Sequence, residues 1–334
     1  MQRLHFELPP GAARPYKQRV PEPFDKPFAA AINARTRYCV VFGHPVRHSA
    51  SPEMQNAGMA ALDLNWRYLA CDVRPEELRE ALGGAKRMGF VGVNLTVPHK
   101  LLALDFMDAL DESAKHWQAV NTVRFEGRNK GGEWLPLQQF EETPPDKVRA
   151  HGFNTDAEAI VRSVREDLGV ELRGARVLLV GVGGAGNVAA LKLAAEGVQE
   201  LFIVNRTHSK AASVAAEIRR RHPLVKVHLE YPRGELDLAI NATSLGLALG
   251  DPFPVDEKLF SLRQARCVFD LIYRPAETKL LTAAKAGGCR VANGLGMLLY
   301  QGAKALEIWS GQPAPIEVMR RALRQNIYGE VNLL

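Results

Sequence analysis

Hydrophobic residues fall along the chain in two alternating patterns. Short continuous apolar runs are typical of buried strands, whereas apolar residues three or four positions apart are typical of helices that pack on a sheet. In the first half these patterns predict strands at residues 37–42, 67–73 and 93–97. They also predict three helices, one that begins near Pro52 and two that cover residues 76–88 and 157–168. Alternating strands and helices indicate an α/β fold.

Residues 176–210 carry the most complete pattern. An apolar run, Val177–Val180, leads into a glycine turn, a small-residue helical stretch and a second apolar run, Leu201–Val204. Glycine permits positive φ and close approach of a pyrophosphate, whose charge is favoured by the N–H groups at the start of the following helix. The turn therefore predicts a dinucleotide site, formed by Gly181, Gly183, Gly184 and Ala185, with a further glycine at position 186.

The end of the second strand distinguishes the two nicotinamide cofactors. An NAD site places an acid there to accept a hydrogen bond from the ribose 2′-hydroxyl, but this chain has Asn205, Arg206 and Thr207. Arg206 and Lys210 suit a 2′-phosphate, because Arg donates two parallel hydrogen bonds to such a group. We therefore expect NADP. The competing interpretation is a solvated basic helix start in another kind of α/β protein.

The rest of the second half extends this arrangement. Strands are expected at residues 226–229, 238–242, 267–272 and 290–292, and helices at residues 211–221, 279–286, 297–309 and 316–325. These segments predict an open, doubly wound parallel sheet of the Rossmann type with helices on both faces. Thr243 and Ser244 follow one strand directly and should face the crevice where such sheets bind ligands.

Composition narrows the class of protein. The chain has 334 residues, 46% of them hydrophobic and 24% charged, and its net charge of +6 is not gathered in blocks. This is typical of a water-soluble protein of two domains and disfavours nucleic-acid binding. No apolar run is long enough for a membrane helix, and the N-terminus lacks the pattern of a signal peptide. We expect a cytoplasmic protein whose partner is a small molecule.

The cysteines and histidines predict neither a disulfide framework nor a metal site. The four cysteines include no C-x-x-C pair, which also favours a reducing compartment. His44 and His48 are four positions apart but have no third ligand at metal spacing.

Two segments fall outside the regular patterns. Residues 1–35 are rich in proline and show no period, which predicts an extension that lies on the surface or is partly disordered. Residues 126–149, rich in glycine and proline, predict a decorated hairpin or an insertion.

Polar residues gather where loops and strand ends are expected. Ser49 and Ser51, two positions apart in an extended loop, would project to the same side and bind one oxygen-rich ligand; alternatively, they cap the following helix. Asn94 and Thr96 would share the polar face of a strand. That face is either the wall of a ligand cleft or the wet side of an edge strand.

Lys100 and Asp156 are the candidates for proton transfer. A lysine at a helix start beside this cleft would be partly desolvated and suited to acid–base work, whereas a solvated lysine is the alternative. Asp156 precedes a helix, where it would either act as an N-cap or be the partner of Lys100 in a proton-handling pair.

Taken in order, these features resemble the shikimate dehydrogenase family. The resemblance runs from about residue 40 to residue 311 and includes the glycine turn. The other motifs that carry it are G-x-P-x-x-H-S-x-S-P at 43–52, N-x-T-x-P-x-K at 94–100, A-V-N-T at 119–122, N-T-D at 154–156, N-R-T at 205–207, N-A-T-S-x-G at 241–246, D-L-I-Y at 270–273 and N-G-L-G-M-L-x-x-Q at 293–301.

The resemblance implies roles for individual residues. Ser49 and Ser51 would bind a substrate carboxylate, Lys100 would be the catalytic lysine and Asp156 its partner. The residues that would bind substrate hydroxyls or lie beside the substrate are Asn94, Thr96, Asn121, Asp156, Gln301 and Tyr273.

The implied reaction is reversible hydride transfer between NADPH and the 3-keto group of 3-dehydroshikimate, which gives shikimate for chorismate and aromatic amino acid biosynthesis. Lys100 as an ammonium would give a proton to the developing alkoxide, and Asp156 would hold the lysine and substrate hydroxyls. Which of the two is the formal acid stays open. Leu271, Gly294 and Met297 would flank the nicotinamide.

The resemblance also implies the domain organisation. Residues 36–156 and 294–334 would form one discontinuous substrate-binding domain, because the last helices cross back to it. Residues 157–293 would form the NADP-binding domain. The assembly would be a monomer or a homodimer.

The chain departs from the family pattern at several positions. Gln55 stands where the family usually has histidine, Ala157 follows Asp156 in place of the usual glycine, and both irregular segments are longer than usual. Ser51, in place of threonine, favours shikimate over quinate. Two alternatives remain: a quinate/shikimate dehydrogenase using NAD or NADP, and a catalytically silent nucleotide-binding regulator, against which Lys100 and Asp156 argue.

Overall fold

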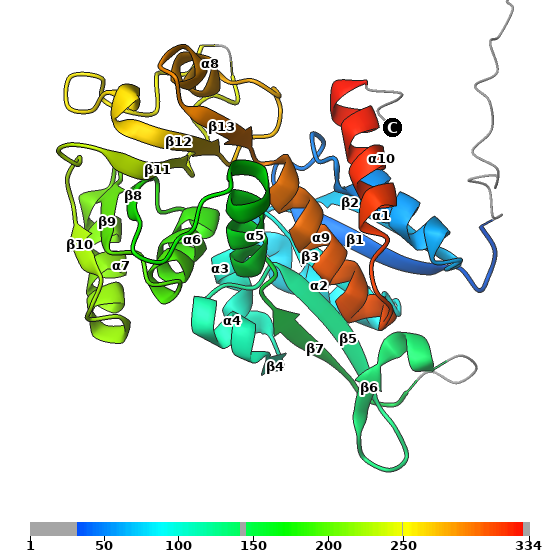
Figure 1. Ribbon diagram of the computed structural model, residues 1–334. Coiled ribbons are helices and arrows are strands. Elements are labelled where there is room, and N and C mark those ends of the chain that lie inside the picture. Colours follow the sequence, from blue (N-terminus) through cyan, green and yellow to red (C-terminus); the bar gives the residue numbers. More distant parts are fainter. Residues whose placement is uncertain (1–31, 141–144, 249, 330–334) are drawn as a thin grey trace, which may run out of the picture.

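The computed structural model describes residues 32–140, 145–248 and 250–329. It has two lobes, each built on its own sheet, which meet along helices α5 (Asp156–Leu168) and α9 (Leu295–Ser310) (Figure 1). The sheet of the first lobe lies within residues 37–153, and that of the second lobe within residues 176–293. Of the proline-rich segment 1–35, residues 1–31 lie outside the described part.

The first lobe contains a mixed sheet of seven strands. Their order is β2-β1-β3-β5-β7-β4, with β6 paired to β5. Strands β1, β2 and β3 are parallel, whereas β5 runs antiparallel to both β3 and β7. The strands are β1 (Arg37–Gly43), β2 (Trp66–Asp72), β3 (Gly92–Leu95), β4 (Ala109–Leu110), β5 (Thr122–Arg128), β6 (Trp134–Pro136) and β7 (Val148–Phe153).

Both faces of this sheet are covered by helices. Along β1, Val40 and Phe42 contact the apolar side of α2 (Leu78–Arg87), whereas Cys39 and Val41 belong to the core beneath α1 (Ser51–Ala61). Successive side chains of a strand point to opposite faces, so the unbroken apolar run of β1 matches a strand that is buried on both sides. Two short helices, α3 (His99–Leu102) and α4 (Glu112–Trp117), complete the lobe.

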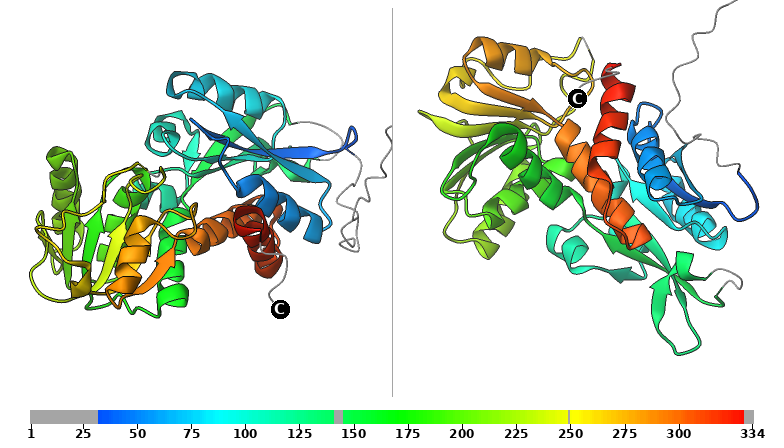
Figure 2. Two further views of the ribbon diagram at one scale, coloured as in Figure 1. Left: turned by 90° about the horizontal axis from the view of Figure 1, so that it is seen from above. Right: turned by 45° about the vertical axis from the view of Figure 1, so that its right-hand side comes forward.

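The last two helices return to the first lobe, as expected. Helices α9 and α10 (Ile316–Tyr328) pack against α1 (Figure 2). Trp309 of α9 reaches the sheet and donates its indole N–H to the Val123 carbonyl over 3.0 Å. A Cβ on Gly92 would lie 2.1 Å from that indole nitrogen, so the strand needs glycine at this position.

The second lobe contains six parallel strands in the order β10-β9-β8-β11-β12-β13. Helices α6 (Gly184–Ala195) and α7 (His208–Arg221) cover one face and α8 (Lys279–Ala286) covers the other. This confirms the predicted doubly wound sheet, whose order reverses between β8 and β11. The strands are β8 (Arg176–Val180), β9 (Glu200–Val204), β10 (Lys226–His228), β11 (Leu236–Asn241), β12 (Ala265–Asp270) and β13 (Arg290–Asn293).

The segment 126–149 contains a hairpin, as one of its two interpretations predicted. Strands β5 and β6 pair antiparallel, and a buried charge cluster links β5 to β7. Burial raises the pKa of the Glu126 carboxyl, but hydrogen bonds from His151, Arg124 and Arg149 outweigh it and lower that pKa to about 2. The start of this segment is therefore part of the main sheet.

Three further properties concern the described residues. None of their helices combines the length and the apolarity that crossing a bilayer requires. They contain no group of three or more His, Cys, Asp and Glu side chains placed to hold a metal ion. All four cysteines are free thiols, and three of them are buried.

Candidate active site

Lys100 and Asp156 are in direct contact. Lys100 lies in α3, directly after the inner strand β3, and Asp156 is the first residue of α5. The Lys100 Nζ donates to Asp156 Oδ2 over 2.7 Å, and the two side chains are 13% and 1% exposed. The expected pairing is confirmed, and the solvated-lysine interpretation is wrong.

Asp156 does not cap its helix, so the N-cap interpretation is also wrong. Thr155 occupies the N-cap position of α5, and its side chain makes no cap hydrogen bond. The backbone N–H groups of Asp156 and Ala157 donate instead to the side chain of Asn154. Because Asn154 satisfies these helix-start donors, both oxygens of Asp156 are available for side-chain partners.

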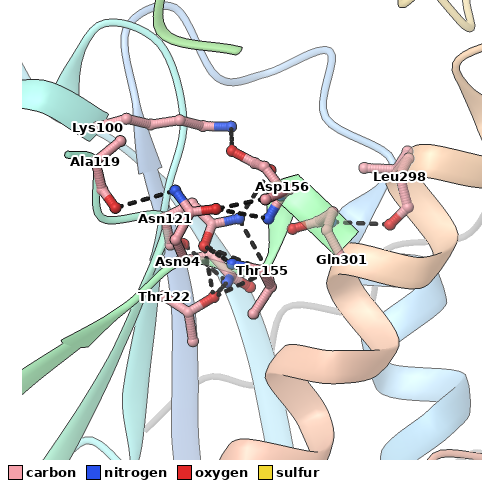
Figure 3. Close-up of polar contacts among 11 residues, drawn as sticks. Asn94, Lys100, Ala119, Asn121, Thr122, Thr155, Asp156, Leu298 and Gln301 are labelled. Atoms are coloured by element: carbon pink, nitrogen blue, oxygen red, sulfur yellow. Dashed lines mark hydrogen bonds and ion pairs between the residues drawn. The ribbon is translucent and has the colours of Figure 1, made fainter. Parts of the chain in front are cut away.

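Asn121 holds the second oxygen of Asp156. Its Nδ2 donates to Asp156 Oδ1 over 2.8 Å and to Thr155 Oγ1 over 2.9 Å (Figure 3). Its Oδ1 accepts the backbone N–H of Thr155 over 2.8 Å. The carboxylate therefore receives an ammonium on one oxygen and an amide on the other.

Asn94 lies one layer deeper in the same polar cluster. Its Nδ2 donates to the Asn121 carbonyl and to Thr122 Oγ1, and its Oδ1 accepts the Tyr68 hydroxyl. Because β3 is an inner strand, the edge-strand interpretation of this polar face is wrong. Strand β3 ends at Leu95, two residues before the end that the sequence predicted, so Thr96 lies beyond it and is half-buried.

Sequence reasoning missed four residues of this cluster. Asn154, Thr122 and Thr155 lie inside the Asn-Thr and Asn-Thr-Asp motifs, so their place in the sequence was a usable signal. Tyr68 sits among apolar residues of β2 and gave no such signal, since an isolated tyrosine in a strand is usually core.

Ser49 closes a turn that begins at Val46 and Ser51 begins α1, so this segment is not the extended loop that we expected. The Ser49 N–H donates to the Val46 carbonyl, and the Ser49 hydroxyl accepts the N–H of Ser51, the first residue of α1. Tyr273 comes from the second lobe to this turn. Burial raises the pKa of its hydroxyl, and a hydrogen bond with the Ala50 backbone acts in the opposite direction.

Gln301 and Gln55 bring α9 to the same region. Gln301 is half-buried, and its Nε2 donates to the Leu298 carbonyl over 2.8 Å (Figure 3). Gln55, at the position where the family usually has histidine, is fully buried and donates to the carbonyl of Gly302. The Gln55 side chain therefore links α1 to α9 at Gly302, the residue after Gln301.

The glycine turn begins directly after β8 and faces the first lobe. Gly181 has φ +95°, and a Cβ on Gly186 would lie 2.2 Å from the Gly181 carbonyl oxygen. Gly183 precedes α6 and has open space around it, and Ala185 is half-buried. A Cβ on Gly184 would lie 3.9 Å from the Lys100 side chain, so the turn and the lysine meet between the lobes.

The end of β9 presents basic side chains to solvent. Asn205 Oδ1 accepts the N–H of Val182 in the glycine turn, and its Nδ2 donates to the Thr207 carbonyl. Arg206 and Lys210 are exposed, and neither has an ion-pair partner within the described part of the chain. Such uncommitted cations fit a 2′-phosphate group.

The remaining cofactor candidates lie just after the carboxyl ends of β11, β12 and β13. Thr243 follows β11, and its hydroxyl donates to Asn241 over 2.7 Å. A Cβ on Gly294 would lie 2.0 Å from the Leu271 carbonyl oxygen, so only glycine fits at the start of α9. Met297 is buried, and Leu271 is half-buried.

Three family models match successive parts of the chain. The model described as the shikimate dehydrogenase substrate binding domain matches residues 41–123. The shikimate / quinate 5-dehydrogenase model matches residues 163–271, and the shikimate 5'-dehydrogenase C-terminal domain matches residues 294–324.

Relatives of similar length extend these matches. The curated shikimate dehydrogenase (NADP(+)) of Methanopyrus kandleri is 37% identical over 306 residues, which cover 90% of this chain and 99% of the relative. A shikimate dehydrogenase crystallised with NADP+ is 35% identical, with a TM-score of 0.74 and coverage of 89% and 97%. The enzyme of Thermus thermophilus, crystallised with NADP(H) and shikimate, is 34% identical, with a TM-score of 0.70 and coverage of 86% and 99%.

We predict that two glycine substitutions separate folding from dinucleotide binding. Gly186→Ala should lower the free energy of unfolding by about 1–3 kcal/mol, because its methyl group overlaps the Gly181 carbonyl. The matched control Gly183→Ala adds its methyl in open space and should leave the unfolding temperature unchanged while weakening NADP binding. Thermal unfolding without ligand and NADP titration check both, and equal unfolding temperatures for the two variants would contradict the prediction.

Proposed function

The chain belongs to the shikimate dehydrogenase family, and from this premise we propose that it reduces 3-dehydroshikimate to shikimate with NADPH, reversibly, in chorismate and aromatic amino acid biosynthesis. The buried contact between Lys100 and Asp156, directly beside the glycine turn, is the observation that carries this proposal. It puts a proton donor next to the expected position of a dinucleotide.

Lys100 is the residue that we propose to give the proton. Bound NADPH supplies a hydride to the carbonyl carbon of the substrate. The Lys100 ammonium then has two tasks: it stabilises the negative charge that develops on the carbonyl oxygen, and it transfers a proton to that oxygen. Hydride and proton together complete the two-electron reduction to the alcohol. Asp156 holds the ammonium in place and is itself held by Asn121.

We propose that both lobes bind the substrate. Ser49 and Ser51 bind the carboxylate, and Tyr273 of the second lobe lies at the same turn. Asn94 and Asn121 use both amide hydrogens within the protein, and Oδ1 of Asn121 already accepts from Thr155 and Thr122. We assign both residues to the substrate hydroxyls, Asn94 through the second lone pair of its Oδ1 and Asn121 through Asp156, whose carboxylate it holds. Thr96 and Gln301 complete the hydroxyl-binding set.

The cofactor is NADP, and we propose that it lies along the carboxyl ends of β8, β9 and β11. Gly181, Gly183, Gly184 and Ala185 bind the pyrophosphate at the start of α6. The residues that we assign to the 2′-phosphate and its ribose are Asn205, Arg206, Thr207 and Lys210. Those that we assign to the nicotinamide half are Thr243, Leu271, Gly294 and Met297.

We also propose that different segments of the chain bind the substrate and the cofactor. Residues 36–156 with 294–334 bind the substrate, and residues 157–293 bind NADP, which matches the separate sheets of the two lobes. Free thiols at all four cysteines fit a cytoplasmic enzyme. Assembly as a monomer or a homodimer stays a prediction, and sedimentation measures it.

A steady-state assay with two acids and two cofactors tests the function. Shikimate with NADP should give the highest kcat/KM of the four combinations. Comparable values for quinate, or for NAD, would favour the quinate/shikimate dehydrogenase. Normal NADP binding without turnover of either acid would favour the silent regulator.

We predict that Lys100→Ala lowers kcat by about 10²–10⁴-fold, the range typical of a proton-transfer group, with little change in shikimate binding. Lys86→Ala is the matched control, because Lys86 pairs with Asp108 at the surface; its kcat should equal that of the unchanged enzyme. Steady-state kinetics and shikimate titration measure both effects. An unchanged kcat in Lys100→Ala would refute the assignment.

We predict that Arg206→Ala weakens NADP binding about 10- to 100-fold, the equivalent of a charged hydrogen bond, and weakens NAD binding far less. Arg220→Ala, which alters an exposed arginine of α7 already paired with Glu217, should leave both affinities unchanged. Calorimetric titration with each cofactor gives the comparison. Equal losses for NADP and NAD in Arg206→Ala would remove the 2′-phosphate argument.

A further inference from the structure

A continuous series of hydrogen bonds leads from Tyr68 to the catalytic pair. The Tyr68 hydroxyl donates to Asn94 Oδ1 over 2.7 Å, and Asn94 Nδ2 donates to Thr122 Oγ1 over 3.0 Å. The Thr122 hydroxyl donates to Asn121 Oδ1 over 3.2 Å, and Asn121 Nδ2 donates to Asp156 Oδ1 over 2.8 Å. We call these five residues the donor chain, because every bond points toward the carboxylate.

Backbone groups fix the orientation of the two amides in the donor chain. The carbonyl of Asn121 accepts from Asn94 Nδ2, and a carbonyl can only accept, so Oδ1 of Asn94 must face Tyr68. The backbone N–H of Thr155 can only donate, so Oδ1 of Asn121 faces Thr155 and its Nδ2 faces Asp156. With both amides oriented in this way, Tyr68 must act as a donor.

Tyr68 is well placed to remain a donor. It lies on β2 with 2% of its surface exposed, and its ring centroid is 6.1 Å from that of Trp309. Burial raises the pKa of its hydroxyl well above the ordinary value. The hydroxyl therefore keeps its proton, and the ring packs independently of it.

We propose that Tyr68 is a positioning residue for the Lys100–Asp156 pair, acting through the donor chain; this inference rests on the proposed function. Aligned hydrogen bonds in a low-dielectric interior polarise and strengthen one another. A donor at the far end strengthens the Asn121 hydrogen bond to Asp156 Oδ1 and keeps Oδ2 directed at Lys100. Without that donor, Oδ1 of Asn94 loses its partner, and the hydrogen bonds further along the donor chain are no longer strengthened by it.

The central test is Tyr68→Phe, which removes the hydroxyl and keeps the ring. We expect kcat to fall about 5- to 10-fold, the equivalent of one hydrogen bond, with an unchanged KM for NADP. Tyr231→Phe is the matched control in the second lobe. The Tyr231 ring centroid is also 6.1 Å from an aromatic neighbour, Phe260, and among the described residues its hydroxyl bonds only the backbone N–H of Asp256. Its kcat should not change.

Thr122 distinguishes the donor chain from simple packing. Thr122→Val removes a link and should lower kcat, whereas Thr122→Ser keeps the hydroxyl and should retain it. Because the donor chain acts as a unit, Tyr68→Phe combined with Thr122→Val should lower kcat no further than the more severe single change. Fully additive losses, or a Tyr68→Phe enzyme as active as the unchanged one, would overturn the inference.

The same variants separate failure of this inference from failure of the proposed function. If the unchanged protein turns over neither shikimate nor quinate, the proposed function is wrong. Urea unfolding of the unchanged protein, Tyr68→Phe, Thr122→Val and the double variant then decides whether the donor chain exists. Non-additive shifts of the unfolding midpoint support it, and additive shifts overturn it. An active enzyme with an unaffected Tyr68→Phe variant overturns the inference alone.

Discussion

The buried ion pair of Lys100 and Asp156 is the constraint on which the site depends. A carboxylate removed from water is costly unless charged or hydrogen-bonding partners replace the solvent. Asp156 is 1% exposed and has one such partner on each oxygen, Lys100 and Asn121. These partners come from α3 and from the residue before β5, so the start of α5 must be held against the sheet of the first lobe. The same contacts that stabilise the buried carboxylate of Asp156 also fix the orientation of its side chain.

The architecture brings this pair to the junction of the two lobes. The order of the second sheet reverses between β8 and β11, which leaves the glycine turn free to face the first lobe. Gly184 approaches Lys100 there, and Tyr273 reaches the Ser49–Ser51 turn from the same side. Helices α5 and α9 pack together where the lobes join. In the function that we propose, the cofactor and the substrate are therefore bound by residues of different lobes that meet at this junction.

Much of the fold and part of the site were predictable, because they depend on residues that are close together in the sequence. Strands and helices followed apolar spacing, and α8 has the bounds that the sequence predicted. The glycine turn needed only its own residues, since close backbone approach leaves no room for a side chain. The pairing of Lys100 with Asp156 was also expected, although the two lie 56 positions apart, because each stands at the start of a predicted helix.

The errors arose where tertiary contacts decide the outcome. The Ser49–Ser51 segment closes into a turn through a backbone bond to Val46, which no side-chain pattern indicates. Helix α5 takes its cap bonds from Asn154, so the acidic residue at its start serves another purpose. The environment of Asn94 depends on the order of strands in the sheet, and the direction of the Tyr68 hydroxyl depends on the backbone carbonyl of Asn121, which orients Asn94. Neither is visible in one stretch of chain.

The return of α9 and α10 to the first lobe has a consequence for biogenesis. Trp309 and Met319 are fully buried against a core that also holds Met54 and Met59 of α1. A ribosome releases these segments in order, so the surface of α1 waits for partners that are translated only after the whole second sheet. The second lobe, whose sheet is contiguous in sequence, has all its strands beforehand. The first lobe therefore begins before the second lobe and is completed after it, and the apolar face of α1 stays uncovered in the meantime.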